Sequence, residues 1–243
     1  MTRFALLADI HGNIWALDAV LADLHRRRIE AIYDLGDSLC SPLAPAETAD
    51  RLIERGIPSV MGNEDRVLIE PLNAAHNVRF TKQQLRPEHF EWIAALPKTR
   101  QPAAGILLCH GTPDSDSTYL MEEVLATGVQ VRDIPSLRLV LLARPDAFIA
   151  CGHSHLPRIL WRDAGRIIVN PGSVGLPAYR DDEPFPHFME AGSPHARYAV
   201  VTRRPQGWQV ELVAVPYDHE AASRCAYANG RPDWASRLLT GRV

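Results

Sequence analysis

The chain has 243 residues, of which 46% are hydrophobic and 23% are charged, and its formal net charge is −3. This composition is typical of a globular protein with a sizeable core, and the mild acidity argues against a protein that coats nucleic acid or a membrane surface. No apolar stretch reaches the length of a membrane span, and the first apolar run is too short for a signal peptide. The four cysteines are scattered without CxxC spacing, which indicates neither a disulfide framework nor a thiolate metal site. We therefore expect a cytoplasmic protein.

Strands and helices alternate along the first sixty residues. Residues 4–8 form a continuous apolar run, which predicts a strand buried on both faces. Apolar residues recur at helical spacing over 14–28, and a second strand is expected at 31–35. A helix over 45–56 then leads to a third strand over 57–61. This alternation predicts right-handed crossovers and a parallel sheet.

The pattern is less regular beyond residue 65. Helices are expected over 81–96, 119–126 and 134–143, together with a short helical tail at the C-terminus. Proline, glycine and charged residues predict a long surface loop over 179–195, in which Arg180, Phe185 and His187 are alternative substrate contacts. The remaining predicted strands are 105–109, 147–151, 159–161, 166–169, 196–202 and 208–215.

Side chains that can bind metal ions follow five of the apolar runs within two residues. In open α/β sheets, ligands bind beyond the carboxyl ends of the strands, so we expect these side chains to gather at one edge. Seven donors exceed what one four-coordinate ion needs and suit two ions that share a bridging carboxylate. Four imidazoles favour Mn, Fe, Co, Ni or Zn over Mg or Ca. The predicted ligands are Asp9, His11, Asp37, Asn63, His110, His153 and His155.

These residues stand in an ordered set of motifs. The motifs are D-x-H at 9–11, G-D at 36–37, G-N-E-D at 62–65, H-G at 110–111 and G-H-S-H at 152–155. The order and spacing resemble the signature of calcineurin-like metallophosphoesterases, and the run N-P-G-S-V-G-L-P that begins at Asn170 resembles their small bacterial phosphodiesterase branch. The resemblance implies an α/β (α+β) fold in which a two-sheet β-sandwich is flanked by helices, the αββα arrangement.

The resemblance also implies a role for each motif residue. One ion is expected to be held by Asp9, His11, Asp37 and His155, and Asp37 should bridge to a second ion held by Asn63, His110 and His153. A metal-bound hydroxide would attack phosphorus in line while the ions neutralise the phosphate charge. The implied catalytic residues are Asn63, Glu64, Asp65 and His110. The implied substrate contacts are Asn63 and Ser173. For Ser173, a loop-shaping role is the alternative.

Glu64 departs from the family pattern. Many members have a histidine at this place, positioned to protonate the leaving oxygen, with an acidic neighbour that orients the imidazole. Here the acidic neighbour, Asp65, is kept, but the imidazole is replaced by a carboxyl. A free glutamic acid titrates about two pH units below a histidine, and nearby cations lower its pKa further. We therefore expect Glu64 to be ionised at neutral pH and to be a poor general acid.

The whole chain is expected to form one domain over 1–243. Two stretches between predicted ligands, near 66–104 and 112–145, are expected to be helical, cap-like insertions that rise over the site. Cys109 and Cys151 precede ligands and are expected to be small buried packing residues. The histidines outside the motifs are expected on the surface: His25, His76, His89, His187, His195 and His219.

The leading hypothesis is a dinuclear metal-dependent phosphodiesterase that acts on a small phosphoester. A phosphomonoesterase and a dinucleoside polyphosphate hydrolase of the same superfamily are alternatives, whereas the chain length and Glu64 disfavour a protein Ser/Thr phosphatase. A non-catalytic protein-interaction scaffold is a further alternative, because the fold also resembles a retromer subunit. The complete ligand set argues against a pure scaffold. Homo-oligomer formation is left open, and neither a membrane nor a nucleic-acid partner is expected.

Overall fold

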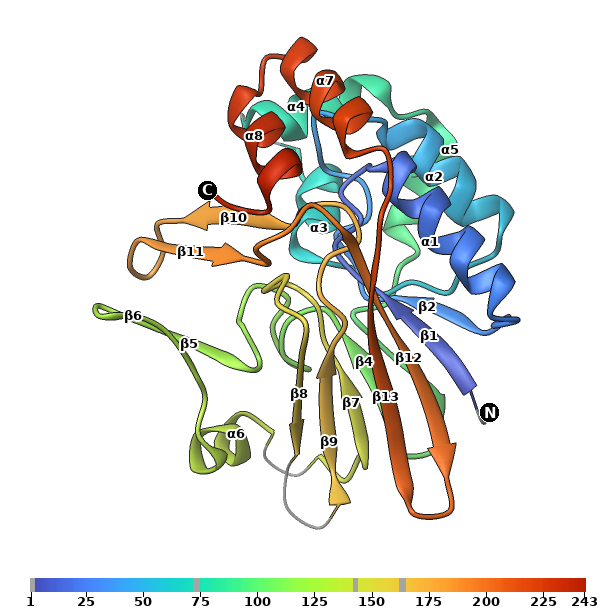
Figure 1. Cartoon of the computed structure of the whole chain (residues 1–243), viewed down its shortest axis with the longest axis vertical. Helices are drawn as coiled ribbons and strands as arrows, with labels where there is room; N and C mark the ends of the chain where they lie inside the picture. The colour runs from blue at the N-terminus through green and yellow to red at the C-terminus, as the bar shows by residue number, and fades with distance from the viewer. Residues whose placement is uncertain (1–2, 72–74, 142–143, 162–164) are drawn as a thin grey trace.

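The computed structural model describes residues 3–71, 75–141, 144–161 and 165–243, and it contains two main β-sheets (Figure 1). The first sheet has the strand order β13 (Gly207–Val215), β12 (Ala196–Arg204), β1 (Arg3–Leu7) and β2 (Ile32–Asp34). The second has the order β3 (Thr99–Ala103), β4 (Ile106–Cys109), β7 (Phe148–Ala150), β9 (Ile167–Asn170) and β8 (Arg158–Trp161).

Each sheet is mixed rather than fully parallel. β1 runs parallel to β2 but antiparallel to β12. In the second sheet, β4, β7 and β9 are parallel, and the antiparallel strands β3 and β8 form its edges. The parallel strands β1, β2, β4 and β7 are followed by the loops that carry all the predicted ligands except Asn63.

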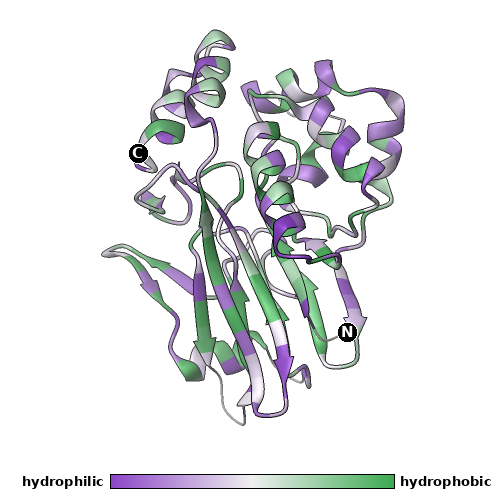
Figure 2. Cartoon of the chain, turned by 45° about the vertical axis from the view of Figure 1, so that its right-hand side comes forward, coloured by the Kyte–Doolittle hydropathy of each residue, from purple (hydrophilic) through white to green (hydrophobic). Residues whose placement is uncertain are grey.

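The two sheets pack face to face through a shared apolar layer. In β1, Phe4 and Leu6 point into this layer, whereas Ala5 and Leu7 pack under the helices on the outer face. The ring of Phe4 meets the ring of Phe148 from the second sheet edge to face, with the centroids 5.8 Å apart. Figure 2 shows apolar residues concentrated along the strands, in keeping with this layer. A strand buried on both faces explains the continuous apolar run at the N-terminus.

Helices flank both sheets. The outer face of the second sheet packs against Leu137 and Leu141, at the end of α6 (Ile134–Val140). None of the helices among the described residues is both long and apolar enough to cross a membrane. The other helices are α1 (Ile14–Arg26), α2 (Pro45–Glu54), α3 (Asn63–Ile69), α4 (His76–Gln84), α5 (Pro87–Ala94), α7 (His219–Ala228) and α8 (Pro232–Thr240).

Two small hairpins stand apart from the main sheets, on the left of Figure 1. One pairs β5 (Glu122–Leu125) with β6 (Gly128–Val131), and the other pairs β10 (Ala178–Asp181) with β11 (His187–Glu190). The β10–β11 hairpin lies at the same end of the sheets as α7 and α8. The predicted α/β fold with two sheets and flanking helices is thus confirmed.

Several predicted elements were wrong in detail. Residues 119–126 contribute to the β5–β6 hairpin instead of a helix, because Gly128, with φ of 121°, permits a tight turn between two valine-containing strands. The predicted loop 179–195 contains most of β10 and all of β11. Residues 57–61 form a single bridge between Ser59 and Asp34 rather than a strand, since Pro58 has no N–H for a ladder.

The helix predicted over 81–96 is divided into α4 and α5. Arg86 has an extended ψ of 163° before Pro87, as expected for a residue that precedes proline, and Pro87 then begins the next helix. Two histidines predicted on the surface are buried instead. His89 contacts Asp50, and His187 shares a hydrogen bond with the Tyr119 hydroxyl, so each buried ring has a polar partner.

Candidate metal centre

The predicted ligands converge from both sheets on one end of the sandwich. Asp9 and His11 follow β1, Asp37 follows β2, His110 follows β4, and His153 and His155 follow β7. Asn63 is the exception to the strand-end pattern, because it is the first residue of α3. The predicted convergence is therefore right, although two facing sheets supply the ligands rather than one open sheet.

The backbone at this end is held in an unusual conformation. Left-handed φ values are costly for residues other than glycine, and they occur in folded proteins where the surroundings enforce them, often at functional sites. Close packing of the turns is part of that enforcement: a Cβ at Gly62 would overlap the carboxylate of Asp37. Five of the predicted ligands have such left-handed φ values: Asp9 (54°), His11 (46°), Asp37 (55°), His153 (67°) and His155 (59°).

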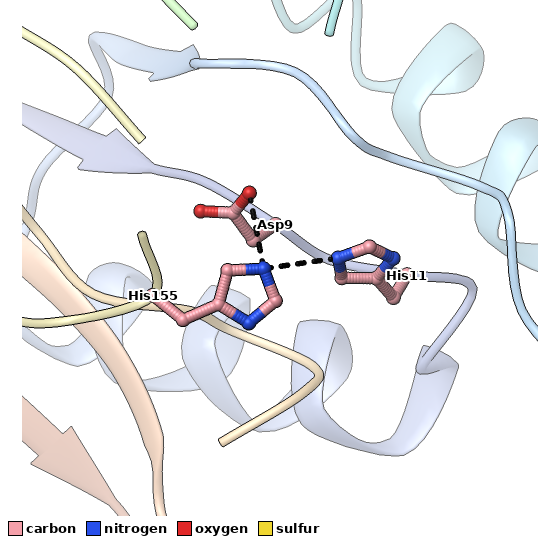
Figure 3. A group of neighbouring side chains, drawn as sticks. All are labelled: Asp9, His11 and His155. Atoms are coloured by element: carbon pink, nitrogen blue, oxygen red, sulfur yellow. Dashed lines mark hydrogen bonds and ion pairs between the residues drawn. The ribbon is translucent and has the colours of Figure 1, made fainter. Parts of the chain in front are cut away.

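Asp9, His11 and His155 form one group of donors (Figure 3). The Nε2 atom of His155 lies 3.4 Å from Oδ1 of Asp9 and 3.2 Å from Nε2 of His11. The Asp9 carboxylate is fully buried, and it accepts a hydrogen bond from the backbone N–H of His153 at 3.2 Å. An unpaired carboxylate at this depth would be unstable, so the site is built for positive charge.

Asp37, His110 and His153 form a second group beside the first. The Nε2 atom of His110 lies 3.2 Å from Oδ2 of Asp37 and 3.1 Å from Oδ1 of Asn63. It also lies 4.0 Å from Oδ1 of Asp9, which belongs to the first group. The two groups are therefore contiguous, and Asp37 also stands with His11 in a third group of donors.

The histidine rings are oriented for metal binding. In three of them the Nδ1 atom faces a backbone carbonyl oxygen, which can only accept, so Nδ1 carries the proton of the neutral ring. The Nε2 lone pair then points into the centre, an arrangement common for metal-ligating histidines. Two such lone pairs only 3.2 Å apart, as in His11 and His155, need a cation between them. The three contacts are His11 to Cys40 (3.0 Å), His110 to Leu35 (2.8 Å) and His155 to Leu176 (2.7 Å).

The pKa values show how strongly the carboxylates attract positive charge. Burial opposes protonation of His11, but Glu64, Asp37 and Asp9 outweigh it and raise the pKa of this ring to about 9. Burial likewise opposes protonation of His110, yet Asp37 and Asp9 raise its pKa to about 10. The pKa of His153, by contrast, falls to about 4 through burial and the nearby His110. Without a metal ion, protons on His11 and His110 therefore balance the buried carboxylates.

Asp65 holds the ligand turns together. It is fully buried, and its carboxylate accepts hydrogen bonds from the backbone N–H groups of Asp37 (2.7 Å), Ser38 (3.0 Å) and Gly62 (3.0 Å). Burial and the charge of Asp37 raise the pKa of Asp65 to about 6, against these backbone bonds. Its contacts are thus to the backbone beside the metal ligands rather than to the Glu64 side chain.

Glu64 lies on the His11 side of the centre. Its Oε2 atom is 3.4 Å from Nδ1 of His11, outside hydrogen-bond geometry, and has no hydrogen-bond partner among the described residues. The backbone N–H of Glu64 donates to Oδ1 of Asp37 at 2.8 Å. Glu64 thus places a carboxyl group beside His11. With His11 and Asp37 it forms the third group of donors.

Ser173 shapes a loop under the centre. It is buried, its hydroxyl donates to the backbone oxygen of Asp9 at 2.7 Å, and it accepts from the backbone N–H of Leu176 at 2.8 Å. These bonds favour the loop-shaping role over substrate contact. Cys109 and Cys151 are buried in the apolar cluster under α6, which confirms them as packing residues.

Two cavities open onto the centre. One of about 340 Å³ is lined by His11, Asp37 and His155, and by residues of β10, α4 and α8. The other, of about 720 Å³, is lined by residues of β5 and of the stretch before it, and by Arg132, Glu183 and Pro184. Both are lined by Asn63, His153 and Asp181. Sequence reasoning missed Arg231, Trp234 and Arg237 in the smaller cavity, because the C-terminal tail carries no motif.

Comparison with known proteins agrees with this geometry. Residues 2–189 match the model of the calcineurin-like phosphoesterase superfamily domain, which covers most of the chain. The chain belongs to this superfamily. The buried His and Asp groups are thus a candidate metal site in a chain of the metallophosphoesterase family, and the superfamily membership predicted from the motifs is confirmed.

Three relatives extend the comparison. An uncharacterized protein of Methanocaldococcus jannaschii is 26% identical over 99% of each chain. The crystal structure of a metallophosphoesterase from Sphaerobacter thermophilus superposes with a TM-score of 0.77 at 24% identity, covering 98% of this chain and 99% of that one. A putative diadenosine tetraphosphatase superposes with a TM-score of 0.53 at 15% identity, covering 88% and 94%. The two structural matches support the fold.

Proposed function

We propose that the chain is a dinuclear metal-dependent phosphodiesterase. The observation that carries the diester assignment is the meeting of two cavities at Asn63 and His153. A phosphomonoester has one organic substituent and fills one cavity, whereas a diester has two. A phosphate placed at the centre can direct one substituent into each cavity.

The proposal assigns the seven predicted ligands to two ions. Asp9, His11 and His155 would hold one ion with Asp37, and Asp37 would be shared with the second. Asn63, His110 and His153 would complete the second site. Manganese, iron, cobalt, nickel or zinc suits this set of imidazole and oxygen donors. When bound, two such ions supply a water of lowered pKa as the nucleophile and neutralise charge on the phosphate.

The residues of the chain itself then orient the reaction. The backbone carbonyls of Leu35, Cys40 and Leu176 fix three imidazole rings, so the donor atoms do not reorganise when substrate binds. Asp65 fixes the relative positions of the Asp37 and Asn63 turns. Asn63 and His153 line both cavities, which places them beside the scissile phosphate in this proposal.

The chain offers a weak general acid at best. Glu64 lies beside His11, with its Oε2 atom 3.4 Å from Nδ1 of that ring. We propose that it remains a carboxylate and that the leaving oxygen departs with little protonation by the chain. Good leaving groups such as aryl oxides need no such proton, so diesters of acidic alcohols are the favoured class.

The insertions predicted near 66–104 and 112–145 have a defined place in the proposal. Ser117, Tyr119 and Glu123, within the second insertion, line the 720 Å³ cavity, and Asn77, within the first, lines the smaller one. We propose that both act as walls of one substrate groove within a single domain. The second insertion contains the β5–β6 hairpin as well as α6.

The experiment that tests the proposal is a metal-by-substrate screen of the purified protein. Chelated protein is reconstituted with each candidate ion and assayed on bis(4-nitrophenyl) phosphate and on 4-nitrophenyl phosphate, which share a leaving group. We expect a higher kcat/KM for the diester and no turnover after chelation. A preference for the monoester would replace the proposal with a phosphomonoesterase, and full turnover without metal would remove the two-metal assignment.

A further inference from the structure

The 340 Å³ cavity is lined by three arginines in addition to the predicted metal ligands. Arg180 comes from β10, Arg231 directly precedes α8, and Arg237 lies within α8. We propose that these guanidinium groups form a subsite for a second phosphate group on the substrate. The inference rests on the proposed function, because it places the scissile phosphate at the metal centre and the second phosphate in this subsite.

Arg237 offers the strongest observation in favour of an anion subsite. Its side chain is only 15% exposed, and its one recorded ionic contact within the described chain is with Asp233 at 3.5 Å. No hydrogen bond of its guanidinium is recorded among the described residues, although this group has five donors. Burial lowers the pKa of Arg237, and two neighbouring arginines act in the same direction. A cation in such a place is stabilised by an anionic ligand.

Arg231 is held rigidly beside it. Two of its nitrogen atoms donate to the Asp233 carboxylate at 2.8 and 2.7 Å, and a third donates to the side chain of Asn77. Its guanidinium carbon also lies 5.6 Å from the centre of the Trp234 ring. Asp233 is thus shared between Arg231 and Arg237, so one carboxylate serves two cations.

Arg180 faces this pair from the β10–β11 hairpin. Its side chain is half exposed and bonds to Asp182 in the hairpin turn at 3.0 and 2.8 Å. Arg180 is among the groups that lower the pKa of Arg237, so the two charges are close enough to repel. A phosphate between them would relieve the repulsion and accept charge-assisted hydrogen bonds from both.

The two cavities differ in charge, which sets a direction for the substrate. The larger cavity is lined by Glu122, Glu123 and Glu183 and by one arginine, Arg132, whereas the smaller cavity is lined by the three arginines together with Asp37 and Glu64. Asp181 lines both cavities and accepts a hydrogen bond from the backbone of Glu183. An anionic substituent is therefore repelled from the larger cavity and attracted to the three arginines of the smaller one.

Two of these arginines lie outside the segment common to the superfamily. The family match ends at residue 189, whereas Arg231 and Arg237 belong to the C-terminal helical pair. The metal ligands all lie inside the match. Arg180, by contrast, lies within the match, so the three arginines of the smaller cavity come from both sides of its boundary. The inferred substrate class is a phosphodiester with a second phosphate on one substituent.

A matched pair of substrates tests the subsite. Thymidine 5′-(4-nitrophenyl phosphate) and its 3′-phosphorylated derivative share the scissile diester and differ only in the second phosphate. In the metal-loaded wild-type protein we expect the 3′-phosphate to raise kcat/KM by about tenfold or more, the size typical of charge-assisted hydrogen bonds. Equal kcat/KM for the two substrates would overturn the inference.

The variants identify the groups responsible. Arg180→Gln and Arg237→Gln, singly and together, are expected to remove the preference for the 3′-phosphate, measured as the ratio of kcat/KM for the two substrates. Arg224→Gln is the matched control, because Arg224 is an exposed arginine of α7 paired only with Glu220 in the described chain. Thermal unfolding checks that each variant is folded. An unchanged preference in both folded single variants and in the double variant would contradict the assignment.

A binding measurement separates this inference from the proposed function. If neither diester is hydrolysed, the proposed function fails, and the subsite is tested by calorimetric titration of the metal-loaded protein with thymidine 3′,5′-bisphosphate and with thymidine 5′-phosphate. Tighter binding of the bisphosphate that is lost in Arg237→Gln would sustain the subsite on its own. Equal binding of the two nucleotides would reject it.

Discussion

The Nε2 atoms of His11 and His155 lie 3.2 Å apart, although the two residues are 144 positions apart in the sequence. Each ring is fixed from behind by a hydrogen bond between Nδ1 and a backbone carbonyl. Two lone pairs held face to face at this distance are stable only with a cation between them. The relationship is one reason why the centre is suited to metal ions.

Removal of ligands on the second metal site should abolish activity without unfolding the chain. His153→Ala and Asn63→Ala are each expected to lower kcat/KM by roughly 10²- to 10⁴-fold, because each removes a proposed metal ligand. Both variants leave the apolar core unchanged, so we expect them to fold. Thermal unfolding followed by circular dichroism should remain cooperative in both variants. Loss of the folded state in both would show that these residues are structural first.

The stability of the metal-free protein should fall as the pH rises from about 7 to 10. His11 and His110 have folded pKa values of about 9 and 10, above the value of about 6.5 expected in the unfolded chain. Their protonation therefore stabilises the folded state fully below about pH 6.5, and this contribution is lost as the pH rises through the folded pKa values. Asp34 and Asp65, with pKa values raised to about 7 and about 6 through burial, change stability mainly below this window.

Melting temperatures of chelated and metal-loaded protein between pH 7 and 10 check this prediction. The metal-loaded protein is the control, because bound ions take the place of the protons on His11 and His110. We expect a steep decline in the chelated protein and a much flatter profile in the loaded one. Parallel profiles would show that the two imidazoles do not carry the balancing charge.

We expect Asp65 to stabilise the folded state and not only to support catalysis. Asp65→Ala leaves three backbone N–H groups without their acceptor, and we expect the free energy of unfolding to fall by at least about 2 kcal/mol. Urea unfolding measures the loss. Asp114→Ala is the control: its side chain is 73% exposed and paired with Arg144, so we expect a change under about 1 kcal/mol. A loss of activity with unchanged stability in Asp65→Ala would favour a direct catalytic role.

Glu64→Gln should change the hydrolysis of aryl and alkyl diesters by similar, modest factors. Its Oε2 atom lies 3.4 Å from Nδ1 of His11, and we expect the side chain to give no proton to the leaving oxygen. The measurement is kcat/KM on bis(4-nitrophenyl) phosphate and on a dialkyl diester, with the aryl substrate expected to be much the faster. A large loss confined to the dialkyl substrate would identify Glu64 as the acid.

The residues of the candidate metal centre could be picked out from the sequence because each signal is local. Asp9, Asp37 and His110 follow short apolar runs directly, and the parallel pairing of those runs brings their ends together. What the runs did not reveal is that they divide between two facing sheets. That division depends on β12, whose antiparallel pairing with β1 connects residues nearly two hundred positions apart.

The three arginines of the smaller cavity and the two hairpins could not be predicted from the sequence, for a different reason. Arg180, Arg231 and Arg237 each sit in polar stretches where arginine is expected on any surface, and only tertiary packing brings them to one cavity. The β5–β6 hairpin is short, and residues 119–126 contain leucine, methionine and glutamate, which favour helices over strands. Gly128 decides the outcome by permitting the turn.

The central claim is that seven side chains bind two ions through a shared Asp37. Its most direct test is the metal content of wild-type protein and Asp37→Asn after reconstitution with Mn²⁺ and desalting, with Asp114→Asn as the control. We predict two ions per chain in the wild type and the control, and none retained in Asp37→Asn, because both sites lose the bridging carboxylate. Two ions retained in Asp37→Asn would contradict the shared site.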